Sequence, residues 1–223
     1  MKSKKNIAII PARGGSKRLL DKNLKLLGNK PLIAYSIEYA KSNGISDIIV
    51  STDDERIKLI AQKYGAIVQD RPKHLSTDTS PTIDTLKYVV ENLDTVYDNV
   101  ILLQPTNPLR PKNLLVDALK LFNTSDFDSL MTVTRNHQKF GKIIDGNFIP
   151  YNYKIGQRSQ DLEPLFFENG LLYITKTNLI KQGKIMGDNN HAMIVDHLFS
   201  QIDIDTQEDF EYANYILKNY AND

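Results

Sequence analysis

The most constraining feature of the sequence is a regular alternation of short apolar runs and amphipathic segments over its first 134 residues. The runs have the length and β-branched composition of buried strands, and the segments between them repeat apolar residues at helical spacing. Strands that alternate with helices form a mostly parallel sheet with helices on both faces. The expected strands are Asn6–Ile10, Asp47–Ser51, Ala66–Val68, Asn99–Leu103 and Ser129–Val133. The expected helices are Pro31–Ser42, Asp54–Tyr64, Thr82–Asn92 and Pro111–Phe122. We therefore predict an α/β fold with a doubly wound, mostly parallel sheet.

The alternation of strand and helix patterns ends after residue 134. Residues 135–170 show no long helical pattern, are rich in Tyr, Asn, Gln and Gly, and include a turn signal at Asp145–Asn147. We interpret this stretch as a small inserted lobe within a single domain that spans residues 1–223. The pattern then predicts a strand at Leu171–Thr175 and a closing helix at Thr206–Lys218, capped by Thr206 and Asp209.

Composition argues against several classes of function. The 28 basic and 27 acidic residues leave a net charge of +1, so overall charge favours neither a nucleic acid nor a membrane surface as a partner. No apolar run is long enough to span a membrane, and the first residues lack a secretory pattern, so we expect a cytoplasmic protein. The absence of cysteine and the four scattered histidines argue against disulfides, a thiolate nucleophile and a histidine-bound zinc.

A basic, glycine-containing loop follows the first expected strand. The stretch PARGGSKRLLDKN, residues 11–23, leaves that strand at its carboxyl end, where open α/β sheets bind ligands. Gly14 and Gly15 allow the backbone to approach an anion and point N–H groups at it. Positive charge comes from Arg13, Lys17, Arg18 and Lys22. The loop matches neither the Walker pattern nor GxGxxG, so composition alone leaves a phosphate site and a solvated basic turn equally open.

Near the other end of the chain, Ile202-Asp203-Ile204-Asp205 alternates apolar and acidic residues. As a strand, this segment would project both carboxylates from one face, with Cα atoms roughly 7 Å apart. A cation between two such charges would relieve their repulsion, and oxygen ligands beside a phosphate-bearing partner suit Mg²⁺. The alternative is an exposed edge strand in which Asp205 leads into the closing helix.

A third stretch, LLQPTNPLR, covers residues 102–110 at the end of another expected strand. Gln104 would emerge at the ligand-facing rim of the sheet, and the two prolines would stiffen the turn. The alternative is a simple connecting loop with a solvated Arg110. Composition does not choose between the two.

Together these motifs form an ordered set that extends over nearly the whole chain. The set comprises IAIIPARGGSKRLLDKN, IIVSTDD, QDRPKHLSTDTSPTID, LLQPTNPLR, ENGLLYI and IDIDTQEDF. It resembles the bacterial CMP-nonulosonate synthetases, the cytidylyltransferases that activate N-acylneuraminate (sialic acid) and its relatives legionaminic and pseudaminic acid. The resemblance implies a Rossmann-like sheet of the nucleotidyltransferase type, a homodimer in which the inserted lobe reaches across to the partner, and a need for Mg²⁺.

The resemblance also implies a reaction and the residues that perform it. CMP would pass from CTP to the anomeric hydroxyl of a nine-carbon 2-keto sugar acid, with release of pyrophosphate. Residues that match the CTP site are Arg13, Gly14, Gly15, Ser16, Lys17, Lys22, Asn23, Arg71 and Thr82. Asp203 and Asp205 match the metal ligands, Gln104 matches a sugar-contacting glutamine, and Lys142 matches a lobe lysine in a weaker register. The group expected to act in catalysis is Arg13, Lys17, Lys22, Asp203 and Asp205.

The chain departs from the family pattern beside the expected sugar site. Counting back from the asparagine–glycine pair places Ser159, and not Arg158, at the usual arginine, so Arg158 either reaches the sugar carboxylate or is solvated. Phe166 and Phe167 either stack on the sugar's acyl and methyl groups or belong to the core. Asn107 replaces the commoner serine of the QPTxPLR loop. These departures bear on the identity of the sugar and not on the reaction class.

Two other functions stay open. One is the related cytidylyltransferase for 3-deoxy-octulosonate, and the other is a nucleotide-binding sensor of the same fold that has lost turnover. The ordered motifs favour the nine-carbon acids over the first, and the intact acidic pair argues against the second.

Overall fold

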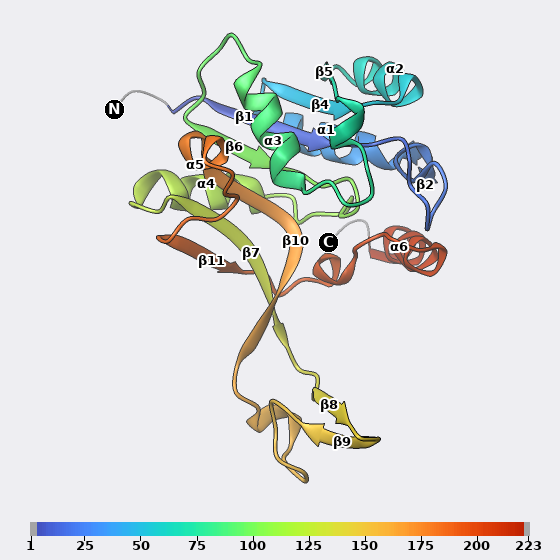
Figure 1. Cartoon of the computed structure of the whole chain (residues 1–223), viewed down its shortest axis with the longest axis vertical. Coiled ribbons are helices and arrows are strands. Elements are labelled where there is room, and N and C mark those ends of the chain that lie inside the picture. Colours follow the sequence, from blue (N-terminus) through green and yellow to red (C-terminus); the bar gives the residue numbers. More distant parts are fainter. Residues whose placement is uncertain (1–3, 221–223) are drawn as a thin grey trace.

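The centre of the protein is a seven-stranded sheet in the order β11-β7-β10-β6-β1-β4-β5, seen in a computed structural model that describes residues 4–220 (Figure 1). The strands are β1 (Asn6–Pro11), β4 (Ile48–Thr52), β5 (Ile67–Asp70), β6 (Asn99–Leu102), β7 (Ser129–Asn136), β10 (Leu165–Lys176) and β11 (Asn190–Ile194). Neighbouring strands are parallel except where β10 pairs with β6 and β7. The predicted doubly wound, mostly parallel sheet is confirmed.

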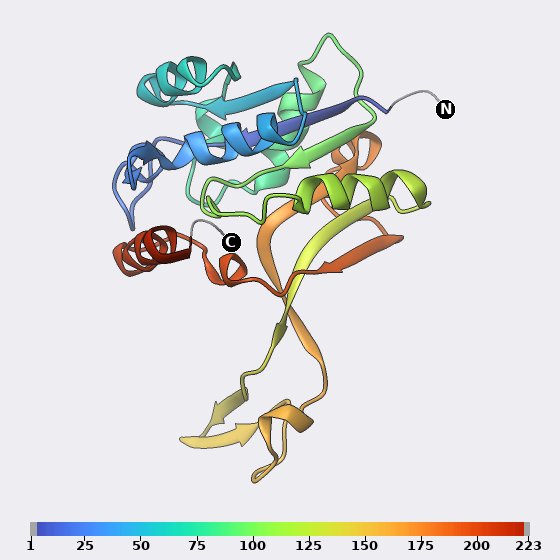
Figure 2. The same cartoon turned by 180° about the vertical axis from the view of Figure 1, so that it is seen from behind.

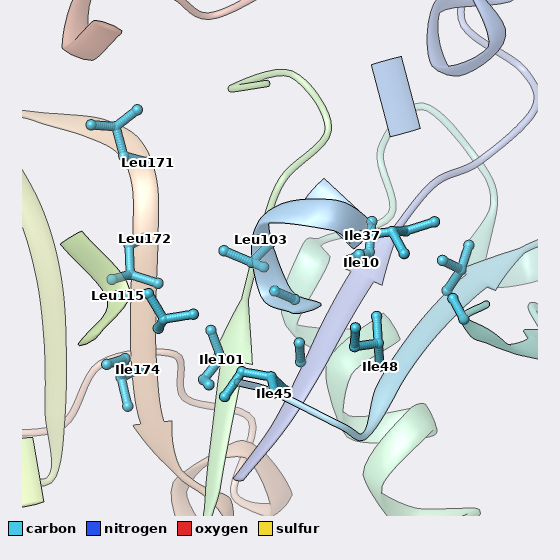
Figure 3. Packing of buried hydrophobic residues seen from close by; sticks show 14 of the residues in the cluster. Ile10, Ile37, Ile45, Ile48, Ile101, Leu103, Leu115, Leu171, Leu172 and Ile174 are labelled. Atoms are coloured by element: carbon cyan, nitrogen blue, oxygen red, sulfur yellow. The ribbon is translucent and has the colours of Figure 1, made fainter. Parts of the chain in front are cut away.

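Helices cover both faces of this sheet (Figures 1 and 2). One face carries α1 (Leu32–Ser42), α2 (Glu55–Lys63) and α4 (Leu114–Thr124), and the other carries α3 (Thr82–Glu91) and α5 (Thr177–Lys181). Alternate residues of β1 point to opposite faces of the sheet. Ala8 and Ile10 pack in a first core with α1, α2 and α4, and Ile7 and Ile9 pack in a second core with α3 and α5. Figure 3 shows part of the first core. None of the described helices is long and apolar enough to cross a membrane.

The closing helix α6 (Gln207–Tyr220) starts at the predicted cap. The N–H of Thr206 donates to Asp209 Oδ2 at 2.8 Å, and the N–H of Asp209 donates to Thr206 Oγ1 at 3.3 Å, which satisfies two N–H groups at the start of the helix. Helix α6 packs in a third core that also contains Ile202 and Ile204. The apolar residues of the acidic segment therefore anchor it. Short elements complete the fold, namely β2 (Leu26–Leu27), β3 (Lys30–Pro31), and the 3₁₀ helices η1 (Lys22–Leu24), η2 (Lys73–Leu75) and η4 (Leu198–Gln201).

An arm projects from the sheet on the continuations of β7 and β10 (Figures 1 and 2). It contains β8 (Gly141–Ile144), β9 (Asn147–Pro150) and the 3₁₀ helix η3 (Ser159–Asp161). The predicted turn joins β8 to β9, and both Asp145 and Gly146 have positive φ, as a type I′ turn requires. Apolar side chains of this hairpin are uncovered, with Ile143 78% and Phe148 52% exposed.

Several elements differ from the prediction. Strand β10 begins at Leu165, so residues assigned to the lobe belong to the sheet, and the sequence pattern predicts neither β11 nor α5. The acidic segment is not a strand. It runs along the loop after β6, where the N–H of Ile204 donates to the Thr106 carbonyl at 2.8 Å in place of a ladder. The predicted alternation still holds, because Ile202 and Ile204 are buried between the acidic residues.

Candidate active site

The basic loop and the acidic segment meet beyond the carboxyl end of β1. Lys22 Nζ donates to Asp205 Oδ1 and to the Ile204 carbonyl, both at 2.9 Å. Arg18 Nη2 donates to Asp205 Oδ2 at 2.8 Å. Two motifs from opposite ends of the sequence therefore form one site, at the edge where parallel α/β sheets bind ligands.

A pocket of about 240 Å³ opens between these two motifs. It is lined by most of the residues predicted to bind CTP, namely Arg13, Ser16, Lys17, Lys22, Asn23, Arg71 and Thr82. Gln104 and Asp205 also lie in its wall. We call this space the loop pocket.

Gly14 serves close packing of the loop. Its N–H donates to Asp53 Oδ1 at 2.9 Å, and a Cβ at this position would lie 2.7 Å from the Cβ of Asp54. Asp53 directly follows β4, and Asp54 caps α2 by accepting from the N–H groups of its first turn. In this structure the Gly14 N–H therefore donates to a carboxylate of the protein itself, and binding of an anion by the Gly14 and Gly15 backbone stays a prediction. Neither Gly14 nor Gly15 lines the loop pocket.

Asp78 binds the cations of the loop pocket. Arg13 Nη2 lies 2.9 Å from Asp78 Oδ1, and Lys17 Nζ lies 2.5 Å from Oδ2. The hydrogen bond from Lys17, supported by the attraction of both cations, holds the pKa of Asp78 below its usual 3.8. Arg13 Nη1 is buried and has no hydrogen-bond partner within residues 4–220. One terminal nitrogen of the guanidinium is therefore unsatisfied, while the other pairs with Asp78.

Asn23 and Arg71 are buried in the pocket wall. Asn23 Nδ2 donates to the Arg13 carbonyl at 2.9 Å and so fixes the backbone that carries the guanidinium. Arg71 Nε donates to the Leu75 carbonyl at 2.7 Å, and burial lowers the pKa of Arg71. Thr82 is the first residue of α3. Hydrogen bonds thus hold the side chains of Asn23 and Arg71 in place in the wall of the loop pocket, which Thr82 also lines.

A second pocket, of about 380 Å³, shares Gln104 with the loop pocket. Its wall comes from the loop after β6, the middle of β10 and the segment before α6, and includes Asn107, Phe167, Glu168, Tyr173 and Asp203. None of the described residues that line it is basic. We call it the acidic pocket. Asp205 faces the loop pocket and Asp203 the acidic pocket, so the two carboxylates flank the junction at Gln104.

Two carboxylates give the acidic pocket its character. Desolvation by the surrounding protein, with a smaller contribution from the nearby charge of Asp205, raises the pKa of Asp203. The hydroxyl of Tyr173 donates to Glu168 Oε1. Burial and this carboxylate raise the pKa of Tyr173, so its phenol stays protonated as a donor.

The structure divides the residues predicted to bind the sugar. Gln104 and Phe167 line the acidic pocket, whereas Phe166 does not. Both phenylalanines are exposed, which rules out the core alternative. The arm carries Lys142 on β8 and Arg158 beside η3, and neither residue lines either of the two pockets of its own chain. Arg158 Nε forms an ion pair with Asp161 Oδ2 at 2.7 Å.

Sequence reasoning missed four acidic or phenolic residues at the site. They are Asp53, Asp78, Glu168 and Tyr173. Asp53 had a usable signal, since it directly follows a strand at the ligand-binding edge of the sheet. Asp78 lies in a loop of Ser and Thr residues whose path over the pocket no local pattern reveals.

The described residues contain no cluster of three or more His, Asp or Glu side chains that could hold a metal by themselves. Asp203 and Asp205 are the carboxylates beside the junction of the two pockets. Any metal there would therefore need further ligands from a bound substrate.

The model of a family described as cytidylyltransferase matches residues 7–223. The chain belongs to the cytidylyltransferase family. The chain is 36% identical to the N-acylneuraminate cytidylyltransferase of Escherichia coli O18:K1:H7 over 94% of the chain, but it spans only 51% of that relative.

Two other relatives match the chain nearly end to end. It is 36% identical to the pseudaminic acid cytidylyltransferase of Campylobacter jejuni serotype O:23/36, with 96% of this chain and 97% of the relative covered. It is 34% identical to the CMP-N,N'-diacetyllegionaminic acid synthase of Legionella pneumophila, with 95% and 96% covered. The chain thus spans about half the length of one group of curated relatives and almost all of another.

Solved structures place the fold among nucleotidyltransferases. A CMP:2-keto-3-deoxy-manno-octonic acid synthetase complexed with CTP superposes with a TM-score of 0.75 at 18% identity, covering 96% of this chain and 98% of the other. A 4-diphosphocytidyl-2C-methyl-D-erythritol synthase gives a TM-score of 0.72 at 12% identity, with 97% and 100% covered. The predicted Rossmann-like nucleotidyltransferase fold is confirmed.

Proposed function

We propose that this cytidylyltransferase transfers CMP from CTP to the anomeric hydroxyl of a nine-carbon 2-keto sugar acid and releases pyrophosphate. The observation that carries the proposal is the meeting of the basic loop and the acidic pair around two pockets that share Gln104. The names of the relatives, which specify N-acylneuraminate, pseudaminic acid and diacetyllegionaminic acid, support this class of acceptor.

The loop pocket would hold CTP. Arg13, Lys17 and Lys22, with the hydroxyl of Ser16, would bind the triphosphate and neutralise the charge that grows on the departing pyrophosphate. The free Nη1 of Arg13 supports this role, because an unsatisfied buried donor gains most from an anionic acceptor. Arg71 and Thr82 would line the cytidine end. Asn23 would act by fixing the loop, whose backbone includes Gly14 and Gly15.

The acidic pocket would hold the sugar acid. In-line attack needs the hydroxyl and the pyrophosphate on opposite sides of the α-phosphorus. Two adjoining pockets with Gln104 between them offer that arrangement, with Gln104 in contact with the sugar. Phe167 lines the sugar side, and Phe166 precedes it on the exposed part of β10. Both offer aromatic surface to acyl and methyl substituents.

Asp203 and Asp205 would hold a Mg²⁺ ion together with phosphate oxygens of CTP. The donor set fits, because Mg²⁺ takes one or two carboxylates plus substrate phosphates and does not need a complete protein cage. When bound, the ion would polarise the phosphoryl group and lower the pKa of the attacking hydroxyl.

We further propose that the chain works as a homodimer, with residues 135–170 as the dimerisation lobe of one nucleotidyltransferase unit spanning residues 1–223. The acidic pocket offers no basic side chain from the described part of its own chain, although its substrate carries a carboxylate. The arm presents Lys142 and Arg158 beside uncovered apolar side chains. A partner's arm laid over the pocket would supply the missing cations. Because the reaction consumes CTP, we place it in the cytoplasm.

The proposal is tested by measuring pyrophosphate release from purified protein with CTP and Mg²⁺. Sialic, legionaminic, pseudaminic and 3-deoxy-octulosonic acids are compared side by side at equal concentration. Release that depends on one of the three nine-carbon acids is expected. Preference for 3-deoxy-octulosonic acid would contradict the acceptor class, and CTP binding without turnover on any of the acids would favour the sensor.

A further inference from the structure

The buried amide of Asn107 links two segments that shape the acidic pocket. Asn107 is 1% exposed, and its Nδ2 donates to the Ile202 carbonyl at 2.8 Å and to the Asn169 carbonyl at 3.1 Å. Its Oδ1 accepts from Thr106 Oγ1 at 3.2 Å. Both amide hydrogens are therefore used, each on a different segment of the chain.

Each linked segment carries a functional side chain. Ile202 directly precedes Asp203, and Asn169 directly follows Glu168. Between Glu168 and Tyr173, β10 advances five residues while its partner β7 advances only two, from Val133 to Met131, so the backbone bulges out of the sheet there. Asn107 thus ties the segment that carries Asp203 to the Glu168–Tyr173 bulge of β10, which forms another wall of the acidic pocket.

The bulge packs directly against this amide. Gly170 has a φ of +73°, and a Cβ on it would lie 2.7 Å from Asn107 Oδ1. Only glycine combines this backbone conformation with so close an approach. The amide and the glycine therefore form one packed unit.

A serine at this position would not reproduce the link. A hydroxyl donates one hydrogen bond and an amide nitrogen donates two, so one of the two carbonyls would lose its partner. The loop after β6 therefore carries a link between the segment of Asp203 and β10 that a serine cannot make.

We propose that Asn107 is a positioning residue, which holds Asp203 in a fixed relation to the Glu168–Tyr173 wall and thereby shapes the acidic pocket for its acceptor. The inference rests on the proposed function only in naming the occupant of that pocket. It concerns the sugar side of the site, because Asn107 does not line the loop pocket.

Asn107→Ser is compared with Asn99→Ser as a matched control. Asn99 is also a 1% exposed asparagine with a hydrogen-bonded amide, which donates to Asn6 Oδ1 at 2.9 Å, but it lies at the amino ends of β1 and β6, opposite the site. Both variants remove one buried amide group, so both are expected to lower the melting temperature.

Only Asn107→Ser is expected to change catalysis. With the most active acid of the panel, its kcat/KM for the acid should fall about tenfold, while its KM for CTP should stay within about twofold of the wild-type value. Asn99→Ser should leave both KM values unchanged. An equal change in kinetics for the two variants, or a change confined to the KM for CTP, would overturn the proposal.

A second measurement does not depend on turnover. Hydrogen exchange followed by mass spectrometry should show faster exchange in Asn107→Ser at both linked segments, around residues 202–206 and 168–172, and wild-type exchange there in Asn99→Ser. Unchanged exchange at both segments in Asn107→Ser would refute the link even if the enzyme used none of the acids tested. Faster exchange in an inactive protein would uphold the link and reject the proposed acceptor alone.

Discussion

The two pockets that share Gln104 differ in how much of their chemistry one chain supplies. The loop pocket gathers Arg13, Lys17 and Lys22 together with the internal carboxylates Asp78 and Asp205. The acidic pocket presents carboxylates and amides, and no basic side chain from the described residues, to a substrate that we propose to be an acid. The comparison teaches that one chain supplies both positive and negative side chains to the loop pocket, whereas the countercharge for an acid in the acidic pocket is not among the described residues that line it.

The largest effect should come from the junction between the pockets. Asp203→Asn keeps the shape of the side chain but removes its charge, so kcat should fall at least about a hundredfold while the CTP dissociation constant changes less than about threefold. Pyrophosphate release and calorimetric CTP titration measure the two quantities. Asp196→Asn, which neutralises an exposed carboxylate on the same segment, should retain wild-type turnover. Undiminished release by Asp203→Asn would remove this carboxylate from the mechanism.

The next effect concerns the loop pocket. Arg13→Gln removes a guanidinium with one unsatisfied donor, so the CTP dissociation constant should rise about tenfold to a hundredfold. Lys58→Gln is the control, because Lys58 pairs with Glu55 and Asp70 on α2 and β5 and lines neither pocket. Equal affinities of the two variants for CTP would show that the loop pocket is not the triphosphate site.

A smaller effect should come from the arm, whose variants should change the KM for the sugar acid and not the KM for CTP. Arg158→Ala and Lys142→Ala should each raise the KM for the sugar acid about tenfold and leave the KM for CTP unchanged, because a carboxylate loses one charge-assisted contact. Lys154→Ala, another exposed arm lysine, is the control. If the arm acts on the partner, a mixture of Arg158→Ala and Asp203→Asn subunits should be more active than either variant alone. An unchanged KM for the acid in both arm variants would exclude the arm from the site.

The smallest effect should come from Asp78. Its carboxylate pairs with Arg13 and Lys17, the cations that we propose bind the triphosphate, so Asp78→Asn should lower the KM for CTP by up to about fivefold. Because the pKa of Asp78 is lowered, its carboxylate is ionised above pH 3.8. It loses its negative charge only as the pH falls through that lowered pKa. The ratio of wild-type to variant KM should therefore stay constant from about pH 6 to about pH 9. A KM for CTP that rises in Asp78→Asn would instead make this carboxylate part of the binding site.

The sequence predicts the parallel half of the fold well because its cause is local. In β1 and β4, unbroken apolar runs follow from burial on both faces, and capping residues such as Asp54 and Thr206 mark where helices start. The sequence predicts strand β10 only in part, because its first residues pair with β7 at the base of the arm, where most of them are exposed and show no alternation of apolar and polar residues. The direction of a strand and its neighbours depend on tertiary contacts that no local pattern contains.

In the site, too, features with a local cause could be predicted and features set by tertiary contacts could not. The basic loop and the acidic pair were found from residue type and order, but the alternation of Ile202 to Asp205 predicted a strand where the chain is held by Thr106 and Asn107 instead. Alternation reports which side chains are buried and not which backbone groups are paired. The carboxylate of Asp78 beside the basic loop has no local sequence signal and could be found only in three dimensions.

Strand β10 passes from the sheet into the arm without an intervening loop, and its ladder with β7 is interrupted only at the bulge between Glu168 and Tyr173. A paired ladder resists bending, so a change in the angle between the two paired parts of β10 would be absorbed at this bulge, which joins them. The bulge is also a wall of the acidic pocket. A ligand that binds against that wall would therefore change the orientation of the arm. A contact that holds the arm in one orientation would change the shape of the acidic pocket, even where that contact lies outside the pocket.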